Sequence, residues 1–221
     1  MKLQNIKEKV LTELAKKECL QQYKISKTDF SLKKTNKEIK IKIGFTNNHW
    51  IDEIHLFPSV KIEHNCIHRI CEKFGFNLNY TAFINLFVLE KVVKGEYTED
   101  TRWKLQYDQK DRFVLFSEDI SNMMVRMNQL LVYAMDYINE NSTIAAIDKL
   151  YNENPTYKYN PNCSGMNTHC AIGLIAAKLS GNPNFSEIAN IYSNILNNDP
   201  DTFFKEDIDA FNRIKEYLTN M

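Results

Sequence analysis

Residues 38–46 read EIKIKIGFT, and this stretch decides the fold class. Isoleucines at every second position alternate with Lys40 and Lys42. Successive side chains of a strand point to opposite faces, so this alternation is typical of a strand that is buried on one side only. The stretch therefore predicts a half-buried strand whose outer face carries lysines.

Two more strands are expected beside this one. A strand near 28–34 precedes it, and residues 50–57 supply a third, in which Glu53 and His55 point away from the apolar side. Pro58 predicts a break or a bend at the end of the third strand, because proline cannot donate to a ladder. Short polar turns between the strands favour an antiparallel meander.

Along the sequence, helices are expected both before and after the strands of this sheet. A 3–4 spacing of apolar residues predicts a helix over 2–23, and the spacing is helical from Ser117 onward. Residues 76–93 suit a helix or a strand, and their β-branched and aromatic content favours a strand. The predicted fold class is α+β in one domain, with a helix and an antiparallel sheet over 1–117 and a helical subregion over 118–221.

The composition excludes several classes of function. The 28 basic and 28 acidic residues give a net charge of zero, which offers no general attraction to nucleic acid or to an anionic membrane. The chain has six glycines and lacks the glycine-rich motifs that cradle phosphates. We expect no cofactor, no nucleic-acid partner and no membrane association.

The neutral total hides an asymmetry along the chain. Residues 1–50 contain 12 lysines and 5 acidic residues, a balance of +7, and the remainder carries a balance of −7. Scattered solvated lysines would explain this. The alternative is a positive face on the N-terminal half that meets an acidic partner.

A protein interface is the function class that remains. The outer side of the sheet and the aromatic loop near 154–165 are the predicted contact surfaces, because charged rims and exposed aromatic anchors are common in interfaces. The candidate partner-binding residues are Lys40, Lys42, Glu53, His55, Tyr157 and Tyr159.

A metal site is the competing interpretation. His64, His68 and Cys71 follow an i, i+4, i+7 spacing, which places three side chains on one face of a helix. Such a set would suit Zn²⁺ with an open position for water, as in a metal-dependent hydrolase. The spacing matches no established zinc motif, so polar helix surface and ordinary buried thiols are the favoured explanation.

The five cysteines indicate the redox environment. They are odd in number, and residues 1–10 lack the apolar core of a secretory signal. Reduced thiols and a cytoplasmic location are expected.

Three segments carry a resemblance to a bacterial family of unknown function. They read IDEIHLFPSVKIEH (51–64), TRWKLQYDQKDRFVLFSEDI (101–120) and HCAIGLIAAKLSGNPNF (169–185). The order of these three segments resembles the order found in that family. Some members of the family are encoded beside toxins and look like immunity proteins. The resemblance implies a non-enzymatic role in which a rigid scaffold binds one partner, a toxin among the candidates. It supplies no catalytic residues.

Overall fold

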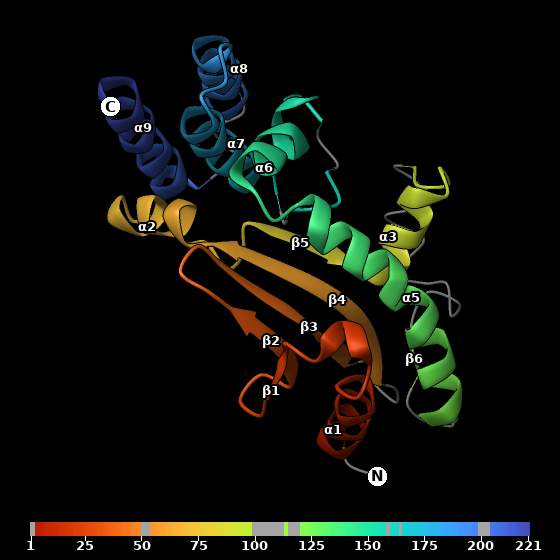
Figure 1. The fold of residues 1–221 in the computed structure, drawn as a ribbon. Coiled ribbons are helices and arrows are strands. Elements are labelled where there is room, and N and C mark those ends of the chain that lie inside the picture. Colours follow the sequence, from red (N-terminus) through yellow and green to blue (C-terminus); the bar gives the residue numbers. More distant parts are fainter. Residues whose placement is uncertain are drawn as a thin grey trace. The chain divides into compact units, whose positions relative to one another are not determined.

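A computed structural model gives the fold, which is α+β as predicted. It describes residues 3–49, 54–98, 113–114, 120–157, 160–163, 165–198 and 204–221. An N-terminal helix is followed by a sheet and then by a helical C-terminal half (Figure 1). Within the described residues, no helix combines the length and the apolar character needed to cross a membrane.

The sheet has six strands in the described residues, arranged in the order β1-β2-β3-β4-β5 with β6 also paired to β4. Antiparallel registers join β1 to β2, β2 to β3 and β4 to β6. The strands are β1 (Lys24–Ser26), β2 (Ser31–Thr35), β3 (Ile39–His49), β4 (Ile54–His64), β5 (Ala82–Asn85) and β6 (Phe113–Val114).

The alternation that decided the fold class is confirmed in β3. Ile39, Ile41 and Ile43 are buried, whereas Lys40 and Lys42 between them are half-buried. In β2, Leu32 is the cross-strand partner of Ile43, so both strands turn their apolar side chains to the same face. This shared face explains why the register is firmly specified: a slip by one residue would expose every isoleucine.

The N-terminal helix is shorter than predicted. Helix α1 spans Leu3–Leu14, a 3-10 turn follows at Glu18–Leu20, and the strand β1 comes next. Cys19 in this 3-10 turn is exposed, whereas the next residue, Leu20, is buried. The helical spacing is lost after Leu14, which is why the chain leaves the helix there.

The strand favoured for residues 76–93 is found only over Ala82–Asn85. The strand β5 ends at Asn85, and residues Leu86–Val93 form the helix α3. The Asn85 side chain accepts a hydrogen bond from the Phe87 amide at 2.8 Å, which satisfies one free donor of the first helical turn. An N-cap residue therefore outweighs the β-propensity of the residues that follow it.

Pro58 does not interrupt the third strand. Figure 1 shows β4 as one long strand that passes through this position. Leu56 pairs with β6 on one side of Pro58, and Ile62 accepts a hydrogen bond from Thr81 on the other. Pro58 lies between these two described pairings, where a missing donor is tolerated.

The C-terminal half is helical, as the spacing predicted. Thr143 caps α6 by accepting a hydrogen bond from the Ala146 amide at 3.2 Å. Helix α2 follows β4 directly. The bounds are α2 (Asn65–Lys73), α5 (Ile120–Glu140), α6 (Ile144–Asn152), α7 (Met166–Ser180), α8 (Phe185–Asn198) and α9 (Lys205–Asn220).

The chain divides into two compact units, and neither is continuous in sequence. Unit 1 comprises residues 1–36, 40–61 and 84–139, and unit 2 comprises 37–39, 62–83 and 140–221. In unit 1 the buried side chains come from α1, α5 and the apolar face of the sheet. In unit 2 the helix α7 is buried over its whole middle, from Thr168 to Ala177.

Candidate functional site

A row of lysines crosses three strands of the sheet in unit 1. Lys24 of β1 is the direct partner of Lys33 in β2, and Lys33 is the direct partner of Lys42 in β3. Like charges placed directly opposite each other on a sheet destabilise it. The row therefore concentrates positive charge on one face of the sheet.

A pocket of about 110 Å³ opens on this side of the sheet. Two ammonium groups, from Lys42 and Lys61, and one carboxylate, from Asp29, carry its charge, so the formal charge of the lining is +1. The lining residues are Asp29, Ser31, Lys42, Gly44, Phe45, Ser59 and Lys61. The pocket is therefore polar, small and slightly positive.

Asp29 binds two of the other residues that line the pocket. Its carboxylate lies 3.1 Å from the Lys42 Nζ and accepts a hydrogen bond from the Ser31 Oγ at 2.8 Å. Burial tends to raise the pKa of Asp29, but hydrogen bonds from two serine hydroxyls and from Lys42, with the charge of Lys42, lower it to about 2. Asp29 is therefore ionised throughout the physiological pH range.

Local backbone geometry places Asp29 at the pocket. Asp29 belongs to the turn between β1 and β2, and the next residue, Phe30, has a φ of 47°, which is unusual for a residue other than glycine. Gly44 lies opposite Ser31, and a Cβ there would sit 3.0 Å from the Ser31 Cβ and 3.2 Å from the Phe30 oxygen. A side chain at position 44 would therefore push this turn away from β3.

The predicted contact residues differ in how exposed they are and in where they lie. Lys40 and Lys42 lie on the lysine-bearing side of β3, as expected. His55 is only 2% exposed, so its expected place on an open surface is not found; it pairs with Val114 of β6, a neighbour that alternation could not reveal. Tyr157 is 37% exposed. Glu53 and Tyr159 lie outside the described residues.

The three residues of the metal interpretation do not share one helical face. His64 is the N-cap of α2 and has extended backbone angles, so only His68 and Cys71 belong to the helix. The His64 Nε2 lies 3.2 Å from the Asn141 carbonyl oxygen, and burial lowers the pKa of His64. Of the His, Cys, Asp and Glu residues that the structure describes, no three are grouped so that they could hold a metal ion.

The cysteines are free thiols, and two of them are fully buried. Burial raises the pKa of Cys71 to about 12 and raises that of Cys170 further. A nucleophilic cysteine needs a lowered pKa, so both buried thiols are suited to packing and not to covalent catalysis.

A second polar cluster lies inside unit 2, between α6, α7 and α8. The His169 Nε2 lies 2.9 Å from the Tyr151 carbonyl oxygen, and the His169 Nδ1 lies 3.4 Å from the Asn160 Nδ2. The Tyr192 hydroxyl donates to the Asn152 Oδ1 at 2.5 Å. These buried and half-buried groups hydrogen-bond with one another, so the cluster contributes to the packing of α6, α7 and α8.

No protein-family model, no curated protein and no solved structure matches this chain.

Sequence reasoning found only part of the lysine-bearing face. Lys40 and Lys42 follow from alternation within one strand, but Lys24, Lys33 and Lys61 join them only through strand pairing. The Asp29 contact was missed because a turn residue carries no periodic signal. Alternation in each strand, combined with the right register, would have predicted the row.

Proposed function

We propose that the chain is a non-enzymatic protein-binding module that uses the lysine-bearing face of its sheet to bind an acidic partner protein. The row formed by Lys24, Lys33 and Lys42 is the observation that supports this most directly. Cross-strand lysines cost folding free energy in the unbound protein, and an acidic surface placed over them would remove that cost.

A toxin neutralised by direct binding is the narrower form of this proposal. It rests on the resemblance to immunity-like proteins and on the absence, among the described residues, of a grouped set of metal ligands. An immunity protein needs a stable surface of complementary charge and no catalytic machinery of its own. The sheet in unit 1 meets that requirement.

The proposal predicts that charge reversal on the sheet abolishes partner capture. The bait is the purified chain, exposed to an extract of its native cells in the wild-type form and as the Lys33→Glu/Lys40→Glu double variant. We expect an acidic protein that the wild type retains at low salt and that the double variant retains at least tenfold less, because two attractions become repulsions. Quantitative mass spectrometry of the eluates measures this.

A matched control separates the sheet from overall charge. The Lys9→Glu/Lys17→Glu variant changes the net charge by the same amount at two exposed positions outside the sheet, and it should capture the partner as the wild type does. Equal loss in both double variants, or equal retention in both, would contradict the proposal. For the narrower form, the captured protein should inhibit growth when expressed alone and lose this effect when expressed with the chain.

A further inference from the structure

We propose that the pocket between Lys42 and Lys61 receives one carboxylate group of the partner, and that Asp29 fills this position in the unbound protein. This inference rests on the proposed function and adds to it the chemical group that is recognised. It also assigns Asp29 the role of an internal competitor. The argument follows from the size of the pocket, its donors and the turn that carries Asp29.

The size of the pocket limits what can enter it. A volume of about 110 Å³ corresponds to only a few water molecules, at roughly 30 Å³ each in the liquid. Sites for nucleotides and other complete small-molecule ligands are usually about 300–1,000 Å³. The pocket therefore fits a single small charged group, such as the end of an acidic side chain, and not a whole metabolite.

The donors of the pocket already hold a carboxylate. The Lys42 ammonium and the Ser31 hydroxyl both bind Asp29, at 3.1 and 2.8 Å. Lys61 and Ser59 add another ammonium and another hydroxyl to the same lining. Ammonium and hydroxyl groups are the donors that bind carboxylates best, and this lining fits a carboxylate because one is bound there now.

Asp29 is held in a way that allows it to be replaced. Its side chain is 39% exposed, and it belongs to a turn and not to a strand. The positive φ of Phe30 is an unfavourable backbone conformation that the contacts of Asp29 help to maintain. When an incoming carboxylate takes over Lys42, the turn can relax, and this relaxation favours the exchange.

The lysine row explains why the incoming group comes from a protein. Lys33 and Lys24 extend the positive surface from Lys42 across two further strands. A free small anion could contact only one part of this surface at a time. A segment with several acidic side chains can place one carboxylate in the pocket and the others along the row.

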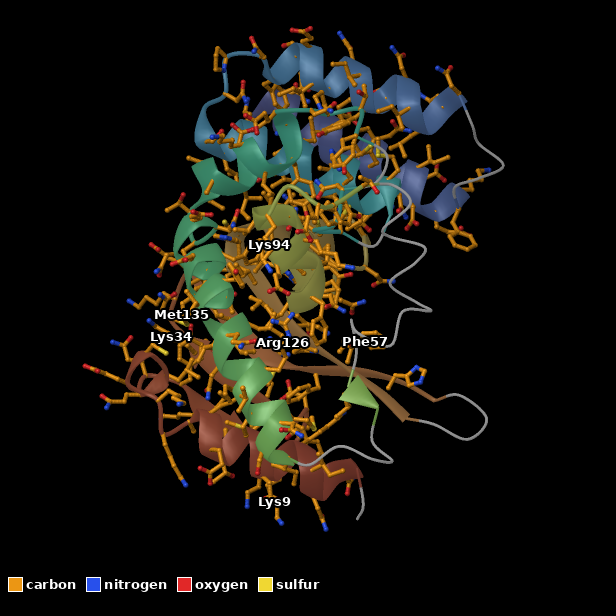
Figure 2. The ribbon with its side chains drawn as sticks, turned by 90° about the vertical axis from the view of Figure 1, so that its right-hand side faces the viewer. Lys9, Lys34, Phe57, Lys94, Arg126 and Met135 are labelled. Atoms are coloured by element: carbon orange, nitrogen blue, oxygen red, sulfur yellow. The ribbon has the colours of Figure 1, made fainter. Side chains whose placement is uncertain are left out.

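The experiment uses a fluorescently labelled hexaglutamate peptide and the purified full-length chain. Fluorescence anisotropy at fixed ionic strength compares the wild type with Asp29→Asn, Lys42→Met and Lys9→Met. We expect Asp29→Asn to bind the peptide about fivefold more tightly, which is the effect of removing one competing charge at about 4 Å in water. Lys42→Met should bind about tenfold more weakly. Lys9→Met changes an exposed lysine on α1, outside the pocket lining (Figure 2), and should stay within twofold of the wild type.

A measurement on the wild type guards against a variant that fails to fold. In ¹H–¹⁵N spectra, adding hexaglutamate should shift the amide signals of Phe30 and Ser31, because Asp29 leaves the pocket. Unshifted signals at saturating peptide would overturn the inference, as would an Asp29→Asn variant that binds no more tightly than the wild type. Inorganic phosphate that displaces the peptide more effectively than acetate does would overturn the assignment to a carboxylate.

These outcomes are separate from those of the proposed function. Suppose that partner capture depends on Lys33 and Lys40 but Asp29→Asn binds the peptide with unchanged affinity. The proposal of an acidic partner would then stand, and the role of Asp29 as a competitor would be wrong. Failure of capture by the wild type would remove the proposed function whatever the peptide experiment gives.

Discussion

Gly173 shows how one residue of α7 sets the packing of unit 2. A Cβ at this position would lie less than 3.0 Å from both the Tyr192 hydroxyl oxygen and the Asn152 Oδ1, and real Cβ atoms do not approach so closely. The Gly173 carbonyl also accepts a hydrogen bond from the Asn152 Nδ2 at 2.8 Å. The absence of a side chain here therefore allows α6 and α8 to share hydrogen bonds beside α7.

The Gly173→Ala variant should lose about 1–3 kcal/mol of unfolding free energy through overpacking, although alanine favours a helix by about 1 kcal/mol. Urea denaturation of the wild type and the variant measures the difference. A Tyr192→Phe change removes the hydroxyl that the new Cβ would meet. In the Tyr192→Phe background, adding Gly173→Ala should cost less than it does alone, and strictly additive losses would argue against the close contact.

Two helices of unit 1 are joined by a charged clamp. The Arg126 Nη1 on α5 donates to the Glu90 Oε1 on α3 at 3.2 Å, and the Arg126 Nη2 donates to the Glu90 Oε2. Lys94 reaches the same carboxylate at 3.0 Å from the end of α3 (Figure 2). Glu90 is 13% exposed, and the hydrogen bonds from Arg126 lower its pKa despite the opposing effect of burial.

The Arg126→Met variant should lose about 1–2 kcal/mol of unfolding free energy, because a mostly buried carboxylate is left without its two-pronged partner. The Arg126→Lys variant keeps the charge but not the planar geometry, so it should recover only part of the loss. Lys94→Met is the matched control, and its effect should be small because this lysine is well exposed. Guanidinium denaturation ranks the three variants, and a larger loss for Lys94→Met than for Arg126→Met would contradict the clamp.

At the level of elements, the sequence predicted what depends on spacing alone. The period of two predicted β3, and the period of 3.6 predicted the helices from α5 to α9. The boundary at Asn85 was missed because an N-cap acts through a single side-chain hydrogen bond. The lysine row was only partly foreseen because register is a property of two strands, and no single strand contains it.

For the whole molecule, buried histidines should set how stability depends on pH. Burial lowers the pKa of His169 to about 4, against the opposing effect of its hydrogen bond with Tyr151, and burial also lowers the pKa of His64. In the unfolded chain a histidine binds a proton near pH 6.5. The unfolded state therefore takes up protons first as the pH falls, and acid favours unfolding.

The free energy of unfolding should accordingly be highest above pH 6.5 and should fall as the pH drops toward 4, with His169 contributing on the order of 3 kcal/mol across that window. Denaturant titrations between pH 7 and pH 4.5 measure the slope in a range where Asp29, with a pKa of about 2, stays ionised in the folded protein. His169→Gln removes the titrating group and should flatten the profile. An unchanged slope would assign the effect to other groups.

The strand β1 has one further consequence for the molecule. It is three residues long, it stands at one end of the strand order, and it carries Lys24. The outermost strand of a sheet exposes unpaired backbone groups that can recruit a strand from another molecule and begin aggregation, and brevity and lysine both oppose this. The first lysine of the row thus also helps to keep separate copies of the chain from joining edge to edge.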